Sequence, residues 1–145
     1  MNKRTIIITL LILVSMCCSS IPVAAQETIP KIIKKALEKY EKEGADQLIP
    51  NLLKGSPLEG DKQALSQVNV VRQIETFYGK YLNYEPLKVV NLTKSTQLVY
   101  YVMNYENGPL FASATVYKNK EKEIIVNFNY HTEFQQIIPP SFIEN

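Results

Sequence analysis

Residues 98–130 read LVYYVMNYENGPLFASATVYKNKEKEIIVNFNY, and most of the predicted sheet lies within them. This stretch contains successive runs dominated by β-branched and aromatic residues, a composition typical of strands: residues 98–105, 110–117 and 123–130. The runs are separated by Asn107-Gly108-Pro109 and by residues 118–121, which suit hairpin turns. Because these connections are too short for a helical crossover, we predict that the strands pair antiparallel.

Alternation along each run predicts which side chains share a face of the sheet. In the run 110–117, one face carries Leu110, Ala112, Ala114 and Val116, and the other carries Phe111, Ser113, Thr115 and Tyr117. In the last run we expect Ile124, Val126, Phe128 and Tyr130 to oppose Ile125, Asn127, Asn129 and His131. The run 98–105 is apolar or aromatic on both faces, which indicates a central strand. A further strand at residues 88–92 completes a sheet of about four strands.

Upstream of the sheet, apolar residues recur at helical spacing. We predict a first amphipathic helix over residues 30–43, capped by Thr28 and ended by Gly44. Its lysines and glutamates alternate along the polar side, which indicates a solvated face. A second helix is expected over residues 46–53, with Pro50 in its first turn or at a kink.

The third predicted helix has the clearest periodicity in the chain. Asp61 suits its N-cap, Gly79 suits its end, and we place the helix over residues 62–78. Its apolar stripe is expected to consist of Leu65, Val68, Val71, Ile74, Phe77 and Tyr78.

Helices followed by an antiparallel sheet predict an α+β domain. We place this single domain at residues 26–145, with a leader at 26–30 and an irregular tail at 132–145. In the tail, Pro139-Pro140 opposes further regular structure.

Three stretches resemble small exported bacterial proteins of the cystatin-like, nuclear-transport-factor-2-like class. They are Phe77 to Tyr81, Tyr100 to Leu110, and the pair Ala114 to Lys118 with Ile125 to Asn129. The resemblance covers about residues 30–130 and rests on element order and aromatic placement. It implies N-terminal helices packed on a curved sheet, with the long helix in its concave side. The resulting cone holds a small ligand, mediates dimerisation or is filled by side chains.

The N-terminus has the pattern of an export signal, which we place at residues 1–25. Met1 to Arg4 provides the positive start, Thr5 to Cys18 is an apolar run, and Val23-Ala24-Ala25 is a small-residue cleavage site. The run is short for a membrane span. A lipid anchor at Cys17 is an alternative, although Met16 is a poor residue before a lipidated cysteine. We therefore expect a periplasmic or secreted protein with no membrane span after processing.

Removal of this segment would change the chemistry that the chain offers. The complete sequence has a formal net charge of +2, and loss of Lys3 and Arg4 brings the balance to zero. A balanced charge argues against nucleic acid as a partner. Both cysteines, Cys17 and Cys18, leave with the signal, which excludes thiol chemistry and thiolate metal sites. We expect no metal and no cofactor.

The candidate ligand-binding residues are few and chemically diverse. Arg72 is the one arginine after residue 25 and suits a carboxylate or phosphate, and His131 is the single histidine. Tyrosine combines an apolar ring with a polar tip, which suits pockets and interfaces. The tyrosines we select are Tyr78, Tyr101, Tyr105 and Tyr117, of which the last three are expected on one side of the sheet.

These observations favour a non-enzymatic exported domain. It would bind an unknown small ligand or protein partner through a tyrosine-rich sheet face or through the cone. One alternative is a cone-fold enzyme in which Arg72, His131 and a tyrosine hydroxyl converge. Another is a structural homodimer joined through the open face of the sheet.

Overall fold

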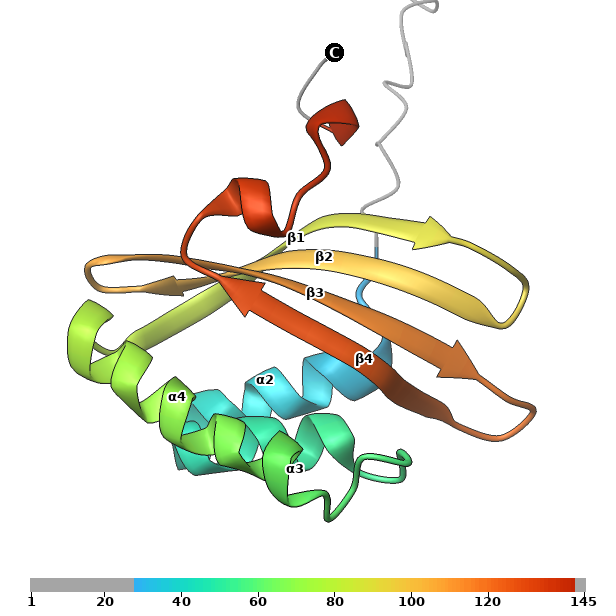
Figure 1. The fold of residues 1–145 in the computed structure, drawn as a ribbon, viewed down its shortest axis with the longest axis horizontal. Coiled ribbons are helices and arrows are strands. Elements are labelled where there is room, and N and C mark those ends of the chain that lie inside the picture. Colours follow the sequence, from blue (N-terminus) through green and yellow to red (C-terminus); the bar gives the residue numbers. More distant parts are fainter. Residues whose placement is uncertain (1–27, 143–145) are drawn as a thin grey trace, which may run out of the picture.

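Helices, a sheet and the C-terminal tail form three successive layers (Figure 1). The computed structural model describes residues 28–142. The predicted signal at residues 1–25 lies outside the described residues. Within them the α+β prediction is confirmed, with helices on one face of an antiparallel sheet and two short 3-10 turns beyond its other face.

The sheet has four strands in the order β1-β2-β3-β4, each antiparallel to its neighbour. Their bounds are β1 Tyr81–Asn91, β2 Thr96–Tyr105, β3 Gly108–Lys118 and β4 Glu123–His131. The central position predicted for 98–105 is confirmed, because β2 pairs on both sides. The first strand begins earlier than the predicted residue 88, since register shifts at Leu82 and Leu87 interrupt its alternation and hide its period.

The register of the central hairpin corrects one prediction about faces. Tyr101 pairs with Ala112 and lies on the helix side, whereas Tyr100 pairs with Ser113 and lies on the opposite, outer side. Tyr117 shares the outer side with Ser113, so it does not lie with Tyr101 and Tyr105 as expected. In an antiparallel pair directly opposed residues share a face, and one unit of register decides which face that is.

A bulge in β4 corrects a second prediction. Thr115 pairs with Asn127 and Val116 pairs with Ile125, which leaves Val126 without a partner. Because of this extra residue, the residues before Val126 point to the opposite face from the one predicted. Ile125 is therefore fully buried, while Val126 is 41% exposed. The expected uninterrupted alternation of this strand is therefore wrong in its first half.

The first helix, α2 Lys31–Glu43, supplies much of the core beneath the sheet. Its buried residues follow one helical stripe: Ile33, Ala36, Leu37 and Tyr40. Pro30 occupies its N-cap position, so the expectation that Thr28 is the N-cap is wrong, and Gly44 follows the last residue of the helix with φ +93°. The predicted second helix is a 3-10 turn, η1 Ala45–Gln47, followed by α3 Leu48–Leu53 with Pro50 in its first turn.

The longest helix, α4 Lys62–Tyr78, has the predicted bounds. The Ala64 N–H donates to Asp61 Oδ1 at 2.7 Å, and the Gly79 N–H donates to the Glu75 carbonyl at 2.9 Å. Its predicted apolar stripe is only partly buried, because α4 packs chiefly against η1 and α3. Phe77, at one end of the stripe, is 85% exposed. Among its residues Val71 is the buried one.

The C-terminal tail crosses the outer face of the sheet (Figure 1). It contains two 3-10 turns, η2 Phe134–Gln136 and η3 Pro140–Phe142, the second of which begins within the proline pair expected to oppose regular structure. Phe142 meets Tyr100 edge-on with ring centroids 5.1 Å apart, and Phe134 meets Phe111 at 6.0 Å. Lys88 Nζ lies 4.1 Å from the centre of the Phe142 ring. Tyr100 is consequently only 6% exposed, and this part of the sheet face is not open.

Candidate functional site

Two of the six predicted site residues lie in the core between helices and sheet. Tyr101 and Tyr105 are both buried on the helix side of β2. Tyr105 belongs to a tyrosine cluster with Tyr40 and Tyr81, in which Tyr40 stacks on Tyr81 at 4.4 Å between centroids. The Tyr40 hydroxyl donates to the Tyr105 hydroxyl at 3.1 Å. These tyrosines therefore fill the space that a cone would leave for a ligand.

Burial also makes these hydroxyls weak acids. Desolvation raises the pKa of Tyr105 to about 12, against a smaller lowering by the Tyr40 hydrogen bond. It likewise raises the pKa of Tyr101 and of Tyr81 above the ordinary tyrosine value. Among the described residues no buried side-chain polar atom lacks a hydrogen-bond partner. The Tyr40 and Tyr105 hydroxyls are thus paired with each other inside the core.

Arg72 lies on the exposed side of α4, away from the sheet. Its Nε donates to Asp46 Oδ1 at 2.6 Å, and its Nη1 donates to Asn69 Oδ1 at 3.0 Å. The hydrogen bond from Arg72 holds the pKa of the Asp46 carboxyl below its ordinary value. The guanidinium therefore ties α4 to η1, with two of its nitrogens already engaged.

The other three candidates lie apart from one another. Tyr78 is half-buried at the end of α4, where its ring faces Gly108. Tyr117 is exposed on the outer side of β3. His131 is exposed at the end of β4, where its Nδ1 accepts a hydrogen bond from the Glu133 backbone N–H at 2.9 Å. Arg72 and His131 lie on different layers, so the structure does not bring them together as the enzyme alternative requires.

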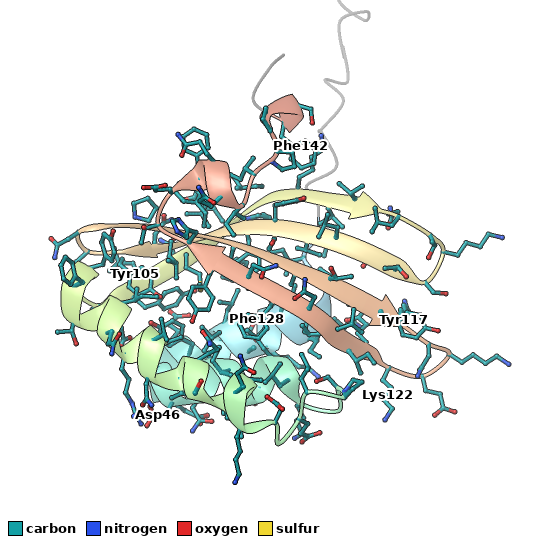
Figure 2. The ribbon with its side chains drawn as sticks, in the orientation of Figure 1. Asp46, Tyr105, Tyr117, Lys122, Phe128 and Phe142 are labelled. Atoms are coloured by element: carbon teal, nitrogen blue, oxygen red, sulfur yellow. The ribbon has the colours of Figure 1, made fainter. Side chains whose placement is uncertain are left out.

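A groove of about 830 Å³ lies elsewhere, between α2 and the hairpin that joins β3 to β4. Lysines from distant parts of the chain line it, and we call it the lysine groove. Lys122, labelled with Tyr117 in Figure 2, marks the hairpin end of this groove. Its basic residues are Lys31, Lys35, Lys39, Lys42, Lys54, Lys118, Lys120 and Lys122, and its acidic residues are Glu38, Glu43, Glu121 and Glu123.

Local structure explains how the lysines converge. The buried stripe of α2 turns its lysines away from the core, toward the groove. The hairpin turn is fixed by Asn119, whose Oδ1 accepts from the N–H groups of Glu121 and Lys122 at 3.1 Å each. The Asn119 N–H in turn donates to the Lys122 carbonyl at 3.1 Å. The turn thereby holds Lys120 and Lys122 beside the helix.

The groove carries an excess of positive charge. Eight lysines against four glutamates give a formal charge of +4. Among the described residues, Lys39 is the one groove lysine in an ion pair, at 3.3 Å from Glu43. Glu38 pairs outside the groove with Lys34 at 3.9 Å, and Glu123 accepts the Ile32 N–H at 3.4 Å. The remaining lysines are available to an anion.

Sequence reasoning did not find this site. The pattern of the first helix indicates a solvated face for its lysines, and nothing local gives a role to those of the hairpin. The one local signal is the spacing of Lys118, Lys120 and Lys122 around a turn. Nothing in the sequence places that turn beside a helix that ends at residue 43.

No group of three or more potential metal-ligating side chains occurs within residues 28–142. In the same part of the chain, no helix has the length and apolar character needed to span a membrane. Comparison of the chain with protein-family models, with curated proteins and with solved structures finds no match.

Proposed function

We propose that this domain is a non-enzymatic binding module that takes a polyanionic ligand in the lysine groove. The observation that carries the proposal is the group of seven groove lysines without an ion-pair partner in the described chain. Such a surface concentrates positive potential where a ligand can approach.

The basic side chains of the groove favour an anion with several separated charges. Among the described residues no arginine lines the groove, so this lining offers no planar fork for bidentate recognition of a single carboxylate. Its lysines are separate point charges on flexible stems that come from α2, from Lys54 and from the hairpin. A chain that bears repeated phosphate or sulfate groups matches this spread of charges better than a compact anion does.

The expected tyrosine-rich binding face is replaced in this proposal by the groove. Tyr101 and Tyr105 are occupied in the core, and Tyr100 is covered by the tail. Membership of the cystatin-like, nuclear-transport-factor-2-like class remains our proposal for the fold. Its support is a sheet with helices packed on one face, although α2 rather than the longer α4 supplies the buried stripe.

Charge reversal at the hairpin tests the groove. We expect the double variant K120E/K122E to weaken binding of inorganic polyphosphate or of a heparin-type sulfated oligosaccharide by about tenfold or more, since each lysine near an anionic partner contributes on the order of 1 kcal/mol. Isothermal titration calorimetry with each probe measures the change and shows which anion binds more tightly. Raising the NaCl concentration should weaken binding of the unmodified protein.

The matched control is K62E/K80E, which makes the same change of charge at two exposed lysines outside the groove. Lys80 lies at the other end of the sheet, where its N–H donates to Glu106 Oε2 at 3.1 Å. We expect it to change the affinity less than about threefold, because screened charges far from a ligand contribute little. Equal losses in the two variants, or no binding of either probe by the unmodified protein, would refute the proposal.

Export remains part of the proposal, and the mass of the protein tests it. When the full chain is expressed in a bacterial host and purified in the form that the cell produces, we expect an intact mass that begins at Gln26. Fractionation should place this form in the periplasm or the medium. A mass that begins at lipidated Cys17 would support the anchor instead, and an unprocessed chain would contradict both.

A further inference from the structure

The two edges of the sheet differ in how well they are protected against pairing with another strand. Along β1, Pro86 and the irregularities at Leu82 and Leu87 break up the edge. In β4 the bulge at Val126 is followed by a regular stretch, Asn127 to His131, with no proline and no lysine, arginine or carboxylate. No strand within residues 28–142 pairs with the outer edge of β4.

This stretch also borders open space. A groove of about 480 Å³ runs between β4 and the start of α4, lined on the strand side by Asn127, Phe128, Asn129 and Tyr130. On the helix side, Gln67 Oε1 accepts a hydrogen bond from the Tyr130 hydroxyl at 2.5 Å. Asn127 and Asn129 are exposed, while Phe128 and Tyr130 are half-buried and pack with centroids 6.2 Å apart. The edge is therefore accessible and its side chains are held in place.

From these features we infer that two copies of this chain associate by antiparallel pairing of their β4 edges around a two-fold axis at Asn129. Such an axis places Asn129 of one copy opposite Asn129 of the other. On the outer face, Asn127 then lies opposite His131 of the second copy. On the helix face, Phe128 lies opposite Tyr130.

Each opposed pair in this register is chemically matched. Amide faces amide, amide faces imidazole, and aromatic ring faces aromatic ring, all on the same face of the extended sheet. Because the stretch carries no carboxylate or ammonium group, self-pairing brings no such like charges together. A register shifted by one residue would place Asn129 opposite Phe128 or Tyr130, which point to the other face of the sheet. Directly opposed residues of an antiparallel pair must share a face, so this register is excluded.

The pairing is short, and it is separate from the proposed ligand site. It lies at the end of β4, whereas the lysine groove touches β4 only at Glu123. An interface of so few residues falls in the class of small, weak associations, with an expected dissociation constant on the order of 10–100 µM.

The test uses the two-fold axis itself. We expect the single variants N129K and N129D each to sediment as monomers at about 200 µM, because the axis sets each new charge against its own copy at about 5 Å. Asn129 is exposed, so neither variant should lose its fold, which circular dichroism verifies. Mixing the two variants should restore a dimer, and native mass spectrometry should show that it contains one chain of each kind.

L82K, which adds the same charge to the exposed side of the β1 edge, serves as the control and should dimerise like the unmodified protein. The inference is overturned by an unmodified protein that is monomeric at about 200 µM, roughly twice the upper end of the expected dissociation constant. It is equally overturned by Asn129 variants that dimerise unchanged, by a mixture that forms no mixed dimer, or by a loss of dimer in L82K.

Discussion

Replacement of Tyr40 by alanine is expected to lower the free energy of unfolding by about 3–5 kcal/mol, the range for large aromatic side chains in well-packed cores. Tyr40 is only 1% exposed and joins the α2 stripe to the sheet through its stack on Tyr81. Truncation would leave a cavity and would also remove the donor to the Tyr105 hydroxyl. Urea denaturation followed by circular dichroism measures the loss.

Tyr40→Phe is the matched control, because it keeps the ring and removes only the hydroxyl. We expect a cost of about 1 kcal/mol, the ordinary contribution of one hydrogen bond. If the alanine and phenylalanine variants were equally destabilised, the ring would not be packed as described and the account of this core would be wrong.

Gly108→Ala is expected to destabilise the protein by about 1–3 kcal/mol through overpacking. A Cβ at this position would lie 2.6 Å from both Cδ1 and Cε1 of the Tyr78 ring. The Tyr78 ring packs against the core, which limits its retreat, and the Asn107 N–H donates to the Tyr78 carbonyl at 2.8 Å, which holds the turn beside the end of α4. Thermal unfolding of the variant would show a lower midpoint.

A double-mutant cycle identifies the cause of that loss. In a Tyr78→Ala background the obstructing ring is absent, so the added methyl group should cost less than about 0.5 kcal/mol. An equal cost in both backgrounds would mean that the strain arises in the turn backbone and that the contact with Tyr78 is incidental.

The parts of the fold predicted correctly are those with local signals. Asp61 and Gly79 fix the two ends of α4 through hydrogen bonds to nearby backbone groups, so three or four residues are enough to place them. The turn at Asn107-Gly108 likewise joins β2 and β3 directly, as the sequence predicts.

The features that the sequence does not predict depend on contacts between residues far apart in the chain. Nothing around Val126 reveals a bulge, since Ile124, Ile125 and Val126 are all apolar and each suits either face of the sheet. The stripe of α4 has a clear period, yet Phe77 is exposed because α4 packs chiefly against η1 and α3. Periodicity identifies a helix and its apolar side, but not how much of that side the fold covers.

The candidate site was missed for a similar reason. Net charge sums over the whole chain, so a near-neutral total hides a groove of formal charge +4. The groove exists only because the hairpin around Lys120 folds back beside α2. Conversely, the chemistry that suggests Tyr101 and Tyr105 as site residues suits pockets and core alike, and the structure places both in the core.

A titration that locates the ligand shows whether the lysine groove is the binding surface. Amide chemical shifts of isotope-labelled protein, purified in the form that the cell produces, would be followed as inorganic polyphosphate or the sulfated oligosaccharide is added. We predict shifts confined to α2, to the residues around Lys54 and to the hairpin from Lys118 to Glu123. Shifts centred on the tail and the outer face of the sheet, with none at the groove, would contradict the claim.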